Sequence, residues 1–229
     1  RRAMEGDQLG INRELAVIAN RQPDTRAHSR PTLQKSSSET KPSRKLPKGM
    51  ADLDEAQVSE NFKHAMQAVV KSGAWPVFLF GATGRGKTYA AAYVFSTWGG
   101  SPVWEDATDV VRKITRCRSS RDGVIYLPCH LDGMTYAHSE SQIIERINAA
   151  PLVVLDDIGL RAPSEAAYDV IYKIVNCRAG KPTIYTSNLS PAEIYRVYDA
   201  RIASRMISGT TIEMTGSDRR MSKTRIVRV

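Results

Sequence analysis

Residues 76–98 read PVFLFGATGRGKTYAAAYVFSTW and decide which fold this chain adopts. The apolar run before the first glycine is typical of a buried parallel strand, and the alanine-rich segment after the lysine and threonine is typical of a helix. Between them, GATGRGKT satisfies the pattern GxxxxGK[ST] at every fixed position. A strand, a glycine-rich loop and a helix in this order predict a phosphate-binding loop at the edge of a parallel α/β sheet.

The residue types in this loop suit a bound triphosphate. Its glycines let the backbone wrap closely around phosphates, so that loop N–H groups and the next helix N-terminus face the anionic oxygens. We expect Lys87 to reach the β- and γ-phosphates of ATP and the Thr88 hydroxyl to complete the coordination of Mg²⁺. The predicted nucleotide-binding residues are Gly81, Ala82, Thr83, Gly84, Arg85, Gly86, Lys87, Thr88 and Tyr89.

A second segment supplies the carboxylate that a magnesium site needs. Residues 151–159 read PLVVLDDIG, a hydrophobic strand that ends in two acidic residues. This is the form of a Walker B segment, in which Asp156 holds Mg²⁺ and Asp157 orients or activates the attacking water. The sequence therefore predicts a metal site made by Thr88 and Asp156, with Asp157 as a catalytic residue.

A third apolar run, PTIYTSN over residues 182–188, also ends in polar residues. Because the carboxyl ends of parallel strands line the ligand crevice, the Asn188 amide is expected to hydrogen-bond the γ-phosphate or the attacking water. The alternative is that Asn188 only begins a turn, since Ser190 and Pro191 fit the N-cap and first position of a helix.

Three further segments complete the predicted architecture. Residues 52–70 carry apolar side chains at helical spacing, with acidic residues at the start, which predicts an amphipathic helix. A short strand is expected near Val103–Trp104, followed by a helix over residues 107–114. The apolar positions of the first helix are Val58, Phe62, Met66 and Val69 or Val70.

The order of these motifs, followed by YDARIASRM at residues 198–206 and GSDRR at residues 216–220, resembles the DnaC and DnaI helicase loaders. The IstB-type transposition ATPases share much of the pattern. The resemblance implies an AAA+ ATPase domain over residues 51–229. Its fold would be an α/β P-loop fold with a parallel sheet flanked by helices and a reduced C-terminal lid.

The same resemblance implies a function. In the loader family, a ring or spiral of subunits engages a replicative hexameric helicase and helps to place it on single-stranded DNA. The chain is then expected to hydrolyse ATP with Mg²⁺ in bacterial or phage DNA replication. Its expected partners are the helicase, single-stranded DNA and further copies of itself.

Arginines in the last two motifs receive roles through the resemblance. Arg205 matches the arginine finger that reaches into a neighbouring subunit's ATP site, and Arg201 lies one helical turn earlier. Arg220 matches sensor II, which contacts nucleotide within the subunit, and Arg219 competes for this role. A guanidinium suits both tasks because it neutralises charge on a transferring phosphoryl group. The alternative for Arg201 and Arg205 is a solvated basic face on a short helix.

Residues 112–121 form a basic stretch that leads into a glycine-containing loop, and we expect this stretch to contact DNA. Lysine and arginine neutralise phosphates without reading the base sequence, and Tyr126 or Tyr136 offers a face on which a base stacks. The alternative is an ordinary solvated helix face followed by a surface loop. The predicted DNA-binding residues are Arg112, Lys113, Arg116, Arg118 and Arg121.

The composition limits the class of protein. The chain has 229 residues, of which 41% are hydrophobic and 25% charged, as expected for one globular domain with an appendage. Its three cysteines form no CxxC pair, which argues against a disulfide framework or a four-ligand zinc site. No apolar run reaches the roughly 18 residues of a membrane span, so the sequence predicts a cytoplasmic protein without a membrane partner.

Residues 1–50 differ in composition from the rest. They hold 11 Lys and Arg against 5 Asp and Glu, and so carry six of the nine net positive charges. Residues 22–49 are rich in Pro, Ser, Thr and Lys, which predicts a flexible basic tail. An apolar patch at residues 9–18 fits a short docking helix for a partner, the end of a truncated domain, or a segment packed on the core.

Two other functions remain open on the sequence. One is a transposition helper of the IstB type, which coats DNA and contacts a transposase. The other is an adaptor in which nucleotide only switches shape and hydrolysis is vestigial. Asp157 supports the adaptor, because many related ATPases carry glutamate at this place and aspartate reaches one methylene less.

Overall fold

Five strands form one parallel sheet in the order β2-β5-β6-β1-β7, which confirms the expected α/β architecture. The computed structural model describes residue 50 and residues 53–128, 134–159 and 163–216. The expected tail up to residue 49, together with Arg219 and Arg220, lies outside these ranges. The strands are β1 (Val77–Phe80), β2 (Val103–Asp106), β5 (Val153–Ile158), β6 (Thr183–Ser187) and β7 (Thr210–Glu213).

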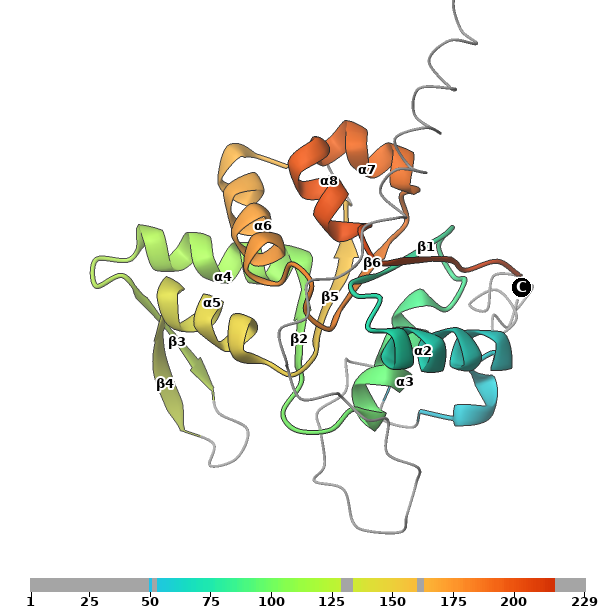
Figure 1. The fold of residues 1–229 in the computed structure, drawn as a ribbon. Coiled ribbons are helices and arrows are strands. Elements are labelled where there is room, and N and C mark those ends of the chain that lie inside the picture. The colour runs from blue at the N-terminus through green and yellow to red at the C-terminus, as the bar shows by residue number, and fades with distance from the viewer. Residues whose placement is uncertain (1–49, 51–52, 129–133, 160–162, 217–229) are drawn as a thin grey trace, which may run out of the picture. The chain divides into compact units, whose positions relative to one another are not determined.

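Helices cover both faces of this sheet (Figure 1). Val77 and Leu79 of β1 pack with α2 and α3, whereas Phe78 packs with α4 to α8, because successive side chains of a strand point to opposite faces. No helix in the described ranges is long and apolar enough to cross a membrane. The helices are α2 (Glu60–Ser72), α3 (Lys87–Thr97), α4 (Ala107–Ser119), α5 (Glu140–Ala149), α6 (Glu165–Cys177), α7 (Pro191–Tyr198) and α8 (Ala200–Met206).

The helix expected over residues 52–70 begins later and is preceded by a short 3₁₀ turn, η1 (Glu55–Gln57). The Asp54 carboxylate accepts a hydrogen bond from the Ala56 amide at 2.9 Å, and this cap starts the turn. Val58 then takes an extended conformation, so α2 starts only at Glu60. The apolar pattern itself is confirmed, because Val58, Phe62, Met66 and Val69 are all buried.

The helix expected over residues 107–114 extends to Ser119 as α4. Its inner face continues past the predicted end, because Cys117 is as deeply buried as Val110 and Ile114. The predicted start of α7 is confirmed. Ser190 caps this helix and forms a reciprocal pair of hydrogen bonds with Glu193, with Pro191 in the first position.

A two-stranded antiparallel hairpin, which the sequence did not predict, lies beside α4 and α5 (Figure 1). It consists of β3 (Val124–Pro128) and β4 (Thr135–Ser139). Tyr126 pairs with Ala137, and Tyr136 pairs with Leu127, so the two tyrosines lie on opposite faces of the hairpin. Both are exposed, at 65% and 45%.

A single residue, Asp199, joins α7 to α8. Its φ of 80° and ψ of 170° fall in a region that is strained for residues other than glycine. Its carboxylate accepts hydrogen bonds from the Arg201 and Ile202 amides at 2.8 and 3.2 Å, and from the Tyr168 hydroxyl of α6 at 2.6 Å. These contacts fix the start of the helix that carries Arg205.

Candidate nucleotide site

The glycine-rich loop begins where β1 ends and passes close to the end of β7. Gly81 has a φ of 142°, and a Cβ placed on it would lie 2.5 Å from the carbonyl oxygen of Met214. The approach is held by a hydrogen bond of 2.7 Å from the Met214 amide to the Phe80 carbonyl. Any residue other than glycine at position 81 would therefore force this loop away from β7.

Lys87 is the first residue of α3, and its buried side chain reaches back to the start of the loop. Its Nζ atom donates to the carbonyl oxygens of Gly81 and Ala82 at 2.7 and 3.0 Å. It also donates to Oδ1 of Asn188 at 2.7 Å, across 101 residues of sequence. The ammonium group thus connects the loop to the polar end of β6.

Thr88 and Asp156 form a pair of oxygen groups next to this lysine. The Thr88 hydroxyl donates to Oδ1 of Asp156 at 3.1 Å, which joins the start of α3 to β5. Burial raises the pKa of Asp156, while hydrogen bonds from the Thr186 and Thr88 hydroxyls act in the opposite direction. Hydroxyl and carboxylate oxygens are hard donors of the kind that Mg²⁺ prefers, so these two residues fit the expected ion.

Asp157 occupies an irregular position at the end of β5. The pairing with β6 runs from Leu155 opposite Tyr185 to Ile158 opposite Ser187, so β5 contains one extra residue there, a β-bulge. Asp157 has a φ of 62°, a left-handed conformation that aspartate tolerates better than most residues.

Asn188 connects the catalytic candidates. Its Oδ1 accepts the bond from Lys87, and its Nδ2 donates to Oδ1 of Asp157 at 3.3 Å. The structure thus brings together five residues that the sequence singled out in three separate segments: Lys87, Thr88, Asp156, Asp157 and Asn188.

Other predicted site residues lie around this cluster or apart from it. The Tyr89 hydroxyl accepts from the Asp54 amide at 2.7 Å and donates to the Asp54 carbonyl at 2.8 Å, which ties η1 to α3. Arg205 is half-buried on α8 and donates to the Arg201 carbonyl of the same helix at 2.7 Å. Arg220 falls outside the described residues.

Thr186 is the residue that the sequence interpretation missed. It is buried on β6, and its hydroxyl donates to Oδ1 of Asp156 and accepts from the Asp157 amide at 2.9 Å. A sequence signal existed, because Thr186 follows a tyrosine inside an apolar strand, and a hydroxyl buried there requires a partner.

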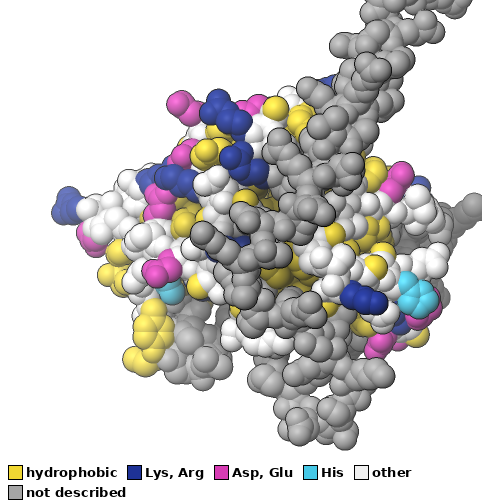
Figure 2. Space-filling model, viewed as in Figure 1, with side chains coloured by type: hydrophobic (Ala, Val, Ile, Leu, Met, Phe, Trp, Pro, Cys, Tyr) yellow, Lys and Arg dark blue, Asp and Glu magenta, His cyan; other side chains and the backbone are white. Residues whose placement is uncertain are grey.

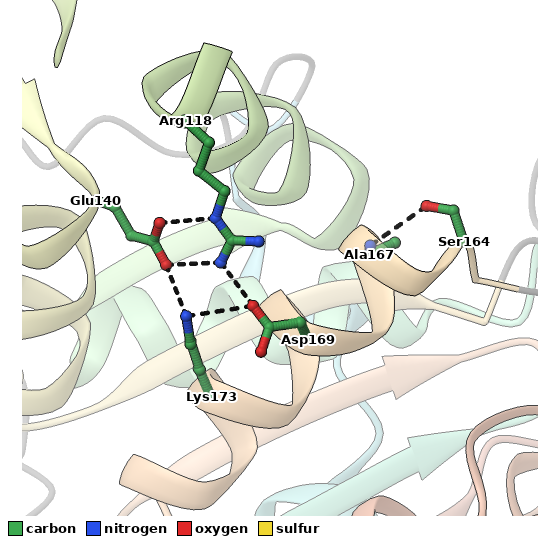
Figure 3. A network of polar contacts seen from close by, with 6 residues as sticks. All are labelled: Arg118, Glu140, Ser164, Ala167, Asp169 and Lys173. Carbon is green, nitrogen blue, oxygen red and sulfur yellow. Dashed lines mark hydrogen bonds and ion pairs between the residues drawn. The ribbon is translucent and has the colours of Figure 1, made fainter. Parts of the chain in front are cut away.

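The basic stretch of α4 is only partly available for other partners. Arg118 donates through two nitrogens to the carboxylate of Glu140, at 2.7 and 2.6 Å, and at 2.7 Å to Asp169 (Figure 3). Lys173 lies 3.0 and 3.2 Å from the same two carboxylates. The four side chains join α4, α5 and α6, and next to them Ser164 caps α6.

The remaining predicted DNA-binding residues differ in their surroundings. Lys113 bonds to Glu105 at 2.6 Å, a buried carboxylate that also pairs with Arg146. Arg112 pairs with Asp109 of the same helix. Arg116 and Arg121 are exposed and form no ion pair within the described residues. Figure 2 shows Lys and Arg side chains mixed with Asp and Glu over α4 and α6.

Comparison by sequence finds no family model and no curated protein that matches this chain. Comparison by structure finds 43 chains. One is DnaA from Aquifex aeolicus bound to AMPPCP, with 19% identity and a TM-score of 0.53 over 74% of this chain and 53% of that one. The chain thus spans about half the length of this DnaA.

Two other similar structures are matched over most of the solved chain. A DnaI structure has 21% identity and a TM-score of 0.51, and the match covers 74% of this chain and 89% of that one. A structure of the DnaC helicase loader has 17% identity and a TM-score of 0.51, and the match covers 66% of this chain and 87% of that one. At these identities the similarity concerns the fold. The described part of the chain has the α/β P-loop fold that the AAA+ proteins DnaA, DnaI and DnaC share.

Proposed function

We propose that this chain is an AAA+ ATPase that acts as a loader of a replicative helicase. The observation that carries the ATPase part is the convergence of three strand ends on Lys87. Its Nζ is 2.7 Å from Asn188 Oδ1, and the adjacent Thr88 is 3.1 Å from Asp156 Oδ1. A phosphate-binding loop with a carboxylate pair and an amide beside it has the groups that phosphoryl transfer to water requires.

Each residue of the cluster has a role in this proposal. Lys87 exchanges its carbonyl partners for the β- and γ-phosphates when ATP binds. Thr88 and Asp156 would hold Mg²⁺, which would supply charge neutralisation at the phosphate oxygens. Asp157 accepts a proton from the attacking water, and Asn188 orients that water or the γ-phosphate.

We further propose that the active form is an oligomer with Arg205 acting on a neighbouring subunit. Arg205 belongs to a short surface helix whose start is fixed by Asp199 and Tyr168. A guanidinium supplied by a neighbour would complete the charge stabilisation at the γ-phosphate. We also propose that residues 1–50 dock a partner. Through the resemblance, we propose that sensor II is Arg220, with Arg219 as the competing candidate.

The DNA-binding part of the proposal rests on the exposed groups of α4 and the hairpin. Arg112, Arg116 and Arg121 supply positive charge for phosphates, and the exposed Tyr126 offers a ring for a base. Lys113 and Arg118 contribute less, because each is paired with a buried or half-buried carboxylate, whereas the pair of Arg112 with Asp109 is exposed to solvent. We place the protein in the cytoplasm, where such a complex forms.

A loading assay tests the whole proposal. A purified replicative hexameric helicase is mixed with circular single-stranded DNA, ATP and Mg²⁺, with or without the full chain, and DNA-bound helicase is counted. We expect the full chain to increase loading, and a chain lacking residues 1–48 to hydrolyse ATP without increasing it. If the full chain has no effect on the helicase but retains a transposase on DNA, the transposition alternative is favoured.

The adaptor alternative is supported by one observation, the aspartate at position 157. An adaptor would bind ATP and show no turnover even with single-stranded DNA present. Measuring phosphate release under those conditions separates the two functions.

A further inference from the structure

We propose that Thr186 is a positioning residue that holds both Walker B carboxylates in place through one hydroxyl. The inference rests on the proposed ATPase function and adds a residue to its site. Thr186 is the residue before the last in β6, and only 1% of its surface is exposed. It lies directly opposite the bulge of β5.

The hydrogen bonds of this hydroxyl are complementary. Its single proton is donated to Oδ1 of Asp156, and its lone pair accepts the Asp157 amide at 2.9 Å. One group therefore contacts the side chain of the first aspartate and the backbone of the second. Asp156 also accepts the hydrogen bond from Thr88. The Thr186 hydroxyl therefore holds the carboxylate of the expected metal site made by Thr88 and Asp156.

The bulge explains why such a contact is needed. In a regular strand, consecutive side chains point to opposite faces, which would send only one of the two carboxylates toward the loop. Here Asp156 contacts Thr88, and Asp157 contacts Asn188, the partner of Lys87. The left-handed backbone conformation of Asp157 directs its side chain toward this cluster. The hydrogen bond from the Asp157 amide to the Thr186 hydroxyl holds the backbone in that conformation.

A set of variants separates positioning from simple packing. Thr186→Val keeps the shape and removes the hydroxyl, whereas Thr186→Ser keeps the hydroxyl. The matched control is Thr183→Val on the same strand, because Thr183 is equally buried but accepts from Arg178 at the opposite end. Binding of AMPPCP with and without Mg²⁺ is measured by calorimetry, and ATP turnover is measured separately.

We expect Thr186→Val to reduce the Mg²⁺-dependent gain in AMPPCP affinity, and also kcat, by about tenfold or more. Thr186→Ser should retain most of both, and Thr183→Val should lower only the melting temperature. The proposal is overturned if Thr186→Val keeps the wild-type metal dependence, or if Thr186→Val and Thr186→Ala unfold while Thr186→Ser folds, which shows a structural role alone. A wild type without turnover would contradict the ATPase function, while the AMPPCP titration still decides the role of Thr186.

Discussion

Asp157 combines an uncommon backbone conformation with the role of general base that we propose for it. Its φ of 62° excludes most side chains, but asparagine adopts this conformation as readily as aspartate. Asp157→Asn should therefore fold and bind ATP normally, because Lys87 and Thr88 are unchanged. Its turnover should fall by about 100-fold or more, because asparagine accepts no proton from water.

The measurement is phosphate release at saturating ATP, with ATP affinity determined in parallel. Asp122→Asn, an exposed residue in the turn before β3, is the control and should behave as wild type. Unchanged turnover in Asp157→Asn would remove this residue from the mechanism.

At this scale the sequence predicted which residues lie together beside the loop but not how they are held. An apolar run precedes each of the motifs GKT, DD and SN. Because parallel strands end at the same edge of a sheet, the three motifs were expected to meet there. The bulge at Asp157 and the bond from Thr186 depend on the register between β5 and β6. That register is set by tertiary packing, which the local pattern does not contain.

At the scale of elements, the ion-pair network of α4, α5 and α6 predicts a pH dependence of stability (Figure 3). The hydrogen bonds from Arg118 lower the pKa of Glu140 from its ordinary 4.5 to about 2. A lowered pKa means that this carboxylate stabilises the fold above its unfolded pKa and stops doing so as pH falls through the folded value. The free energy of unfolding should therefore decrease between about pH 5 and pH 2.

Urea unfolding of the wild type and of Glu140→Gln across this range measures the contribution. The variant should be less stable at pH 7 and should lose less stability on acidification. Glu145→Gln, an exposed residue on the same helix, is the control and should follow the wild type. Parallel acid profiles for all three proteins would show that the network contributes nothing measurable.

Elements with a strong local signal were predicted well, and those defined by distant contacts were not. The strand before the glycine-rich loop, α3 and the capped start of α7 carry their signals in a few consecutive residues. The hairpin of β3 and β4 was missed, because its strands alternate weakly and Tyr126 and Tyr136 are exposed. The start of α2 was placed too early, because the cap at Asp54 belongs to a separate turn.

At the scale of the whole molecule, the proposed arginine finger makes a prediction about mixed assemblies. Arg205→Ala should bind ATP but lose turnover by about a thousandfold, because each pocket then lacks its neighbour's guanidinium. Lys87→Ala should also be inactive, because its own pocket cannot hold the phosphates. Mixing the two variants should restore activity, since one supplies intact pockets and the other supplies intact fingers.

The control for this experiment is Arg196→Ala, an exposed arginine on α7, which should be fully active alone. Normal turnover by Arg205→Ala alone, or an inactive mixture in which both variants still assemble, would assign Arg205 to a solvated helix face.

The sequence predicted the fold class of the molecule, but not the order of the strands in the sheet. The strand order β2-β5-β6-β1-β7 places β1 inside the sheet, which brings its loop against strands on both sides. This order arises from contacts among distant segments, so the local patterns predicted a parallel sheet without its arrangement.

The central claim is that the cluster around Lys87 binds and hydrolyses ATP, and one measurement tests it most directly. Phosphate release from ATP is followed with the full chain, Mg²⁺ and single-stranded DNA, for the wild type, for Lys87→Ala and for Lys71→Ala, an exposed lysine at the end of α2. The account predicts turnover by the wild type and by Lys71→Ala, and none above background by Lys87→Ala. Equal turnover by the wild type and Lys87→Ala would contradict it.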